Sequence, residues 1–171
     1  MVGVLSDAAA QSRSDPDDNF LRAAYCVGVL RQTIDVELGK REKDFPTSQS
    51  CQSEYAAYGF SSAENCLSAR SFMTDAMAEQ RKELQQKLKR YVDYVKVRVF
   101  NQDNNFPPSL IAVVAKGKSD AAAVPSAVPR TKRCLEKCLA SFQCLVDCVA
   151  EHDQISANVL RCQLLPDGLP F

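Results

Sequence analysis

The chain contains no tryptophan, a single histidine and no excess of either charge sign, with 21 basic and 21 acidic side chains. The balanced charge excludes a nucleic-acid binder that depends on overall positive charge. No uninterrupted apolar run approaches the roughly 18 residues of a membrane-spanning helix, so no transmembrane segment is predicted. With 46% hydrophobic and 25% charged residues, the composition is typical of a globular protein and not of a disordered or collagen-like chain.

Motifs of common catalytic sites are also missing from the sequence. There is no glycine-rich phosphate loop, no G-x-S-x-G nucleophile elbow and no H-E-x-x-H zinc motif. The histidine, His152, falls near the end of a predicted helix, where a histidine commonly interacts with the helix dipole. We therefore expect a non-enzymatic binding or structural role without a cofactor. The sequence is compatible with a protein partner but identifies none, and it does not fix an oligomeric state.

Eight cysteines are the main positive feature of the 171-residue chain. An even number in a chain of this size predicts that the thiols pair in an oxidising compartment. Ala8-Ala9-Ala10, followed by Gln11, fits the small-x-small pattern of signal cleavage sites. We therefore predict that residues 1–14 are a disordered tail that retains the end of a signal peptide, and that the protein is periplasmic or secreted.

The first helix is predicted over residues 16–42. Asp15-Pro16-Asp17-Asp18 combines a capping residue, a proline suited to the first helical position and acidic groups that favour the helix N-terminus. Apolar residues then recur every three to four positions from Phe20 to Leu38. In the polar segment that follows, residues 48–57 are expected to hold a short helix with Cys51.

A long second helix is predicted from a capping box at Ser61-x-x-Glu64 to about residue 99. Its apolar positions follow a helical spacing throughout. The alternation of valine with basic residues near its end supports an alternative, a small hairpin that pairs residues 95–100 with 110–115 and makes the fold α+β.

The last third of the chain is expected to hold two more helices. Ser109 caps a short apolar helix, and an Ala/Pro/Ser-rich linker over residues 117–130 separates it from a last helix at about 132–152. Residues 166–171 are predicted to be an irregular tail. The sequence thus predicts an all-α fold: a disulfide-cross-linked bundle of three to four helices, in one domain over residues 15–165.

The predicted last helix carries a stripe of cysteines, Cys134-x3-Cys138-x5-Cys144-x3-Cys148. At about 100° per residue, the four side chains fall within an arc of about 120°, and a disulfide inside one straight helix is strained. Each is therefore expected to pair with a cysteine elsewhere in the chain, which makes the last helix a central hub. The four partners available are Cys26, Cys51, Cys66 and Cys162.

Metal binding is the alternative function of this stripe. Thiolates four residues apart on one helix bind soft ions such as Cu(I) or Zn(II), and His152 continues the same face after Cys148. The repeated C-x3-C pattern in a helical bundle resembles the bacterial copper-storage proteins. The resemblance implies Cu(I) held by thiols that line the bundle core. This chain has two such pairs, and it carries leucine and phenylalanine where that family adds further thiols. The alternative metal ligands are Cys134, Cys138, Cys144, Cys148 and His152.

A second comparison concerns the nine residues between Cys134 and Cys144 and between Cys138 and Cys148. This spacing is similar to that of the C-x9-C proteins of the mitochondrial intermembrane space. In that family the two pairs lie on separate helices, whereas here they overlap on one predicted helix. The pairing of that family is therefore not carried over.

Overall fold

A computed structural model describes residues 18–99, 108–124, 134, 136–138 and 141–164. The secondary structure of these residues is helical and includes no strand, which confirms the all-α prediction. The alternative hairpin is wrong, because the described residues of 95–100 and 110–115 lie within two helices. The predicted tails, 1–14 and 166–171, lie outside the described residues.

The first helical run has three parts: α1 (Asp18–Gln32), a π-helical turn η1 (Thr33–Glu37) and α2 (Leu38–Lys43). It matches the predicted helix over 16–42, of which residues 16 and 17 are not described. The predicted apolar face is the buried face, since Ala24, Leu30 and Leu38 have no exposed area. The helix ends shortly before Pro46, which has no backbone N–H to continue it.

The long second helix is confirmed as α4 (Ala63–Val99). Its N-terminal cap lies one residue later than predicted. The hydroxyl of Ser62 accepts a hydrogen bond from the Asn65 backbone N–H at 3.2 Å, and the Asn65 side-chain amide donates to Ser61 Oγ at 2.8 Å. Asn65 therefore fills the position that the predicted capping box gave to Glu64, whose side chain is exposed.

Helix α5 (Pro108–Ala123) is longer than the sequence predicted. It continues through residues 117–123, so the prediction of a linker from residue 117 is wrong over this part, while residues 125–130 are not described. Gly117 and Ala121 are buried, and Gly117 lies directly against the backbone of α1. The small residues that suggested a linker are instead the ones that allow another helix to approach closely.

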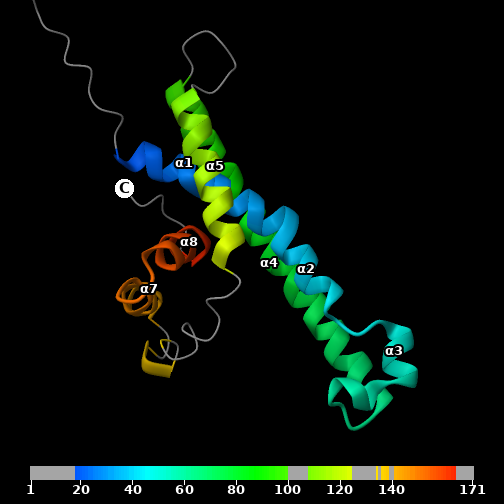
Figure 1. The fold of residues 1–171 in the computed structure, drawn as a ribbon. Coiled ribbons are helices and arrows are strands. Elements are labelled where there is room, and N and C mark those ends of the chain that lie inside the picture. The colour runs from blue at the N-terminus through cyan, green and yellow to red at the C-terminus, as the bar shows by residue number, and fades with distance from the viewer. Residues whose placement is uncertain (1–17, 100–107, 125–133, 135, 139–140, 165–171) are drawn as a thin grey trace, which may run out of the picture.

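Helices α4 and α5 each pack against α1, and the three helices form the main core (Figure 1). Helix α8 (Gln154–Leu164) adds Val159 and Cys162 to this core. The sequence did not predict α8, although Asp153 is a good capping residue: its carboxylate accepts hydrogen bonds from the Ile155 and Ser156 backbones at 3.0 and 3.1 Å.

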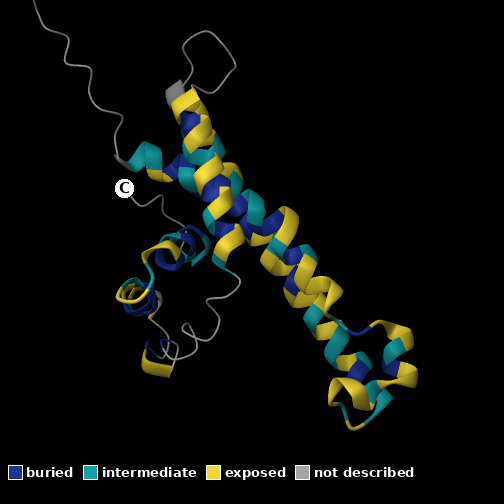
Figure 2. Ribbon diagram, viewed as in Figure 1, coloured by how far each residue is buried: buried dark blue, intermediate teal, exposed yellow. Residues whose placement is uncertain are grey.

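The short helix predicted within 48–57 is present as α3 (Ser48–Ser53), followed by the 3₁₀ turn η2 (Tyr55–Tyr58). Both lie at the far end of α4, away from the three-helix core (Figure 1). Burial is concentrated where the helices of the main core meet, and this far end is largely exposed (Figure 2).

A second, smaller core lies beside the first, between α7 (Phe142–Ala150) and α8 (Figure 1). The prediction of one continuous last helix over 132–152 is wrong, because it is interrupted before α7. The expected central position is also wrong, since α7 packs against α8 at the side of the molecule. Among the described residues, no helix is both long enough and apolar enough to cross a membrane.

Candidate functional site

The four cysteines of the stripe bond to each other. Cys134 pairs with Cys148 and Cys138 with Cys144, with Cα–Cα distances of 5.8 and 5.5 Å. The expectation that each would bond to a cysteine outside the stripe is therefore wrong. The outer pair encloses the inner pair, so the two disulfides are nested.

A break at Ser141 explains this pairing. On one continuous helix, Cys134 and Cys148 would lie about 21 Å apart along the axis. Ser141 instead adopts an extended backbone, with φ −92° and ψ 108°, and its hydroxyl caps α7 by accepting a hydrogen bond from the Cys144 N–H at 3.3 Å. The helical residues before the break thus fold back against α7. A serine at a helix cap was the local signal, and the uninterrupted apolar face obscured it.

The four cysteines outside the stripe also pair among themselves. Cys26 of α1 bonds to Cys162 of α8, and Cys51 of α3 bonds to Cys66 of α4. All eight cysteines are therefore in disulfides. The protein is a disulfide-stabilised helical protein, and Cys26–Cys162 connects α8, which contributes to both cores, to the centre of the main core.

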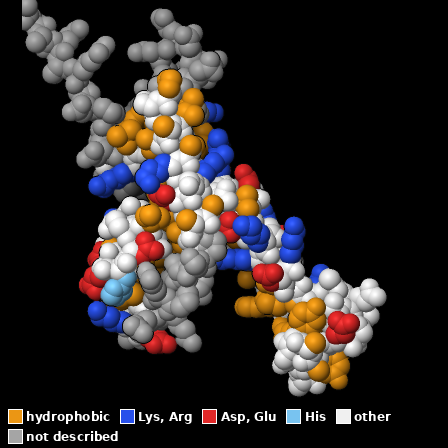
Figure 3. Space-filling view, viewed as in Figure 1, with side chains coloured by type: hydrophobic (Ala, Val, Ile, Leu, Met, Phe, Trp, Pro, Cys, Tyr) orange, Lys and Arg blue, Asp and Glu red, His pale blue; other side chains and the backbone are white. Residues whose placement is uncertain are grey.

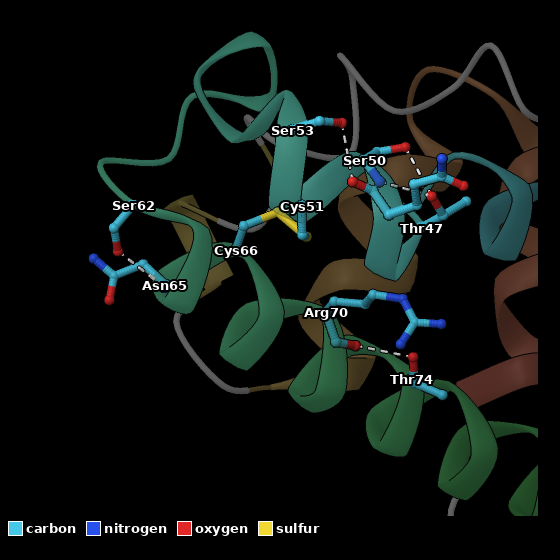
Figure 4. The surroundings of a disulfide bond; sticks show 10 residues. Thr47, Ser50, Cys51, Ser53, Ser62, Asn65, Cys66, Arg70 and Thr74 are labelled. Carbon is cyan, nitrogen blue, oxygen red and sulfur yellow. Dashed lines mark hydrogen bonds between the residues drawn. A yellow bond between two sulfur atoms is a disulfide. The ribbon is translucent and has the colours of Figure 1, made fainter.

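The Cys51–Cys66 disulfide fixes the far end of α4 (Figure 4). Both sulfur-bearing residues have no exposed area. Thr47 caps α3 by accepting a hydrogen bond from the Ser50 N–H at 3.0 Å, so the helix that carries Cys51 begins at a defined residue. The caps and the disulfide together hold this end where little apolar burial is present.

The residues of the alternative metal site are not arranged as metal ligands. A sulfur atom in a disulfide is not a thiolate, so Cys134, Cys138, Cys144 and Cys148 would first have to be reduced. His152 is exposed in the turn between α7 and α8. In the part of the chain that the structure describes, no group of three or more His, Cys, Asp or Glu residues is placed to hold an ion.

The feature best suited to binding is a cleft of about 530 Å³ between α1, α5 and α8. Its wall includes the Cys26–Cys162 disulfide, and Leu21 and Ile155 supply apolar surface on two of the helices. The sequence did not predict this cleft, because one of its walls is α8. The capping residue Asp153 and the helical spacing of Ile155, Val159 and Cys162 were the signals that would have revealed that wall.

The carboxylate of Asp120 in the cleft is already bonded to neighbouring side chains of the protein. The Tyr25 hydroxyl of α1 donates a hydrogen bond to Asp120 Oδ2 of α5 at 2.9 Å, and Lys116 Nζ lies 3.0 Å from the same oxygen. Burial, and secondarily the hydrogen bond to this carboxylate, raises the pKa of Tyr25. The Asp120 charge is thus balanced by Lys116 and shared with a neutral phenol.

Two arginines of the cleft are not balanced in this way. Arg22 of α1 and Arg161 of α8 line it, and within the described residues neither forms an ion pair. Arg22 is exposed and Arg161 is partly buried. Figure 3 shows basic side chains beside an acidic one over α1 and α5. The cleft therefore carries two cations in excess of its one carboxylate.

A larger hollow of about 660 Å³ lies between α4 and α8. Its polar groups are used in packing: Lys87 Nζ donates to the Gln163 carbonyl at 2.7 Å, and the Gln163 amide donates to Thr33 Oγ1 at 2.9 Å. Acidic Glu79 and Glu83 also line it, opposing its basic residues. It has less unbalanced charge than the α1–α5–α8 cleft.

Comparison with known proteins gives no relative to guide the assignment. No family model matches the chain, and neither a similar curated protein nor a similar solved structure is found.

Proposed function

We propose that this is an exported protein, periplasmic or secreted, with a non-enzymatic binding role. In this proposal the disulfides keep a set of helices in a fixed arrangement, and the cleft between α1, α5 and α8 is the surface that the arrangement presents. The protein acts by binding rather than by changing a substrate.

The observation that carries the proposal is the complete pairing of the cysteines. Paired thiols persist in the periplasm or outside the cell, whereas cytosolic thiols are kept reduced. One of the disulfides also joins segments far apart in the chain, since 136 positions separate Cys26 from Cys162. Each such link stabilises the fold, mostly by constraining the unfolded chain.

Intact mass spectrometry of the freshly isolated protein tests the proposal. Reduction is expected to add eight hydrogen atoms, two for each of the four disulfides, and alkylation without reduction is expected to add nothing. Thiols that react before reduction would contradict an oxidised, exported protein.

A double variant, Cys51→Ala with Cys66→Ala, provides the matched control. It lacks one disulfide and should gain six hydrogen atoms on reduction. Fractionation of the producing cells then locates the oxidised form, and recovery of that form only from the cytosol would exclude export.

A further inference from the structure

We propose that the α1–α5–α8 cleft binds a small organic anion with an apolar body, such as a medium-chain carboxylate. The acid group lies between Arg22 and Arg161, and the apolar body lies against Leu21 and Ile155. This inference rests on the proposed binding role and adds to it the chemical class of the ligand.

The charge of the cleft selects an anion. Arg22 and Arg161 approach it from different helices, and neither has an ionic partner among the described residues. A guanidinium forms paired hydrogen bonds with a carboxylate, and a hydrogen bond between charged groups is stronger than a neutral one. The cleft's one acidic residue, Asp120, is already bonded to Lys116 and Tyr25. A bound anion would therefore meet unpaired positive charge.

The apolar lining selects a ligand with a hydrocarbon part. Ile155 leaves 45% of its surface exposed although it is a large aliphatic side chain. Leu21 and the Cys26–Cys162 disulfide line the same cleft. Covering this surface with a hydrocarbon chain removes apolar area from water, which favours binding.

The size of the cleft suits a small molecule. Its volume of about 530 Å³ lies within the range of ligand pockets, which is roughly 300–1,000 Å³. The two walls that carry the arginines, α1 and α8, are joined by the Cys26–Cys162 disulfide. This link limits how far the walls can separate and so reduces the entropy lost when a ligand binds.

Calorimetric titration of the oxidised full chain with decanoate tests the inference, with decyltrimethylammonium as a ligand of the same chain length and opposite charge. Decanoate should bind and the ammonium compound should not. The double variant Arg22→Gln with Arg161→Gln should weaken decanoate binding by about tenfold or more. Ile155→Ser should also weaken it, because it shortens the apolar wall without changing the charge.

The matched control variant is Arg31→Gln with Lys118→Gln. Like the test variant, it removes two positive charges, but from positions on α1 and α5 that do not line the cleft. Decanoate binding should therefore be unchanged. Circular dichroism establishes that each variant is folded. Hydrogen exchange should show that decanoate protects peptides from α1 and α8.

Three results would overturn the inference: no decanoate binding, equal binding of the cationic ligand, or equal affinity in the two double variants. Each leaves the proposed export and oxidation in place, since intact mass tests those separately. Free thiols in the isolated protein would instead contradict the proposed function, whatever the titration shows.

Discussion

Gly28 of α1 and Gly117 of α5 lie at the point where the two helices touch backbone to backbone. A Cβ atom at Gly28 would overlap the Val114 carbonyl oxygen, and one at Gly117 would overlap the Tyr25 carbonyl oxygen. The two helices run antiparallel here, since Gly28 meets Val114 whereas Tyr25, earlier in α1, meets the later α5 residues Gly117 and Asp120. Only glycine at both positions permits this approach.

The first prediction concerns this crossing. Gly28→Ala forces a methyl group into the backbone of α5, and overpacking of this kind costs about 1–3 kcal/mol of the free energy of unfolding. Urea denaturation followed by circular dichroism measures the loss. Gly117→Ala is expected to act in the same direction.

Gly39→Ala is the control for that prediction. Gly39 lies inside the helical run, in α2, and no atom lies within 4 Å of a Cβ built there. Alanine is the better helix former, so this variant should gain roughly 0.5–1 kcal/mol. A Gly28→Ala variant as stable as Gly39→Ala would show that α1 and α5 do not approach as closely as described.

A second prediction tests the hydrogen bond between Tyr25 and Asp120. Tyr25→Phe removes a donor to a carboxylate and is expected to lower the free energy of unfolding by about 1–2 kcal/mol. Tyr58→Phe is the control, because the exposed Tyr58 side chain has no such bond among the described residues. Equal stability of the two variants would contradict the described bond.

A third prediction is the pH dependence of the same contact. The folded state raises the pKa of Tyr25, by burial first and the Asp120 hydrogen bond second, whereas the unfolded chain titrates near 10. The contribution of the protonated Tyr25 to the free energy of unfolding is therefore complete below about pH 10. It is lost as the pH rises further, because the unfolded chain then releases the phenol proton more readily than the folded protein. Between pH 9 and about 11, Tyr25→Phe should therefore lose less stability than the unmodified protein. Burial also raises the pKa of Tyr91, which both proteins retain.

A fourth prediction distinguishes the nested disulfides from the hub that the sequence suggested. Trypsin cuts the unreduced chain after Arg133 and Lys137, and a protease that cuts before aspartate separates Cys144 from Cys148 at Asp147. Peptide 134–137 should be linked to a peptide beginning at residue 147, and peptide 138–146 should hold its own disulfide. A link from 134–137 to a peptide with Cys26, Cys51, Cys66 or Cys162 would instead support the hub.

A fifth prediction compares the two other disulfides. They close loops of very different length, with sequence separations of 136 and 15. By the chain-entropy model, Cys26→Ala with Cys162→Ala should cost about 5 kcal/mol, and Cys51→Ala with Cys66→Ala about 3 kcal/mol. Hydrogen exchange should show that the second change affects mainly α3 and the start of α4. Uniform loosening of all helices by that second change would contradict the described separation of the far end from the core.

The helices of the first hundred residues were predictable because their signals are local. Periodic apolar residues marked the face of α1 that contains Ala24 and Leu30, and the face of α4 that contains Leu84 and Val95. The disulfide pattern was not predictable in the same way, because it depends on whether one residue, Ser141, continues or interrupts a helix. A change of backbone conformation at that residue converts a stripe of thiols into two nested bonds.

The cleft was missed for a related reason. Its charged residues come from three helices, and Arg22 and Arg161 are nowhere near each other in sequence. They line one hollow because the Cys26–Cys162 bond joins α1 to α8, and the backbone contact at Gly28 places the third wall, α5, against α1. Both are long-range relationships that a local pattern does not encode.

The bond between Cys26 and Cys162 also determines what a protease can do to this molecule. A single cut of the peptide chain anywhere between those two residues leaves both fragments attached through sulfur. A cleaved molecule would keep its helices together and its mass would rise only by one water. Separating the two fragments left by one such cut requires a reductant as well as the protease, so a single nick in an oxidising environment does not divide the molecule.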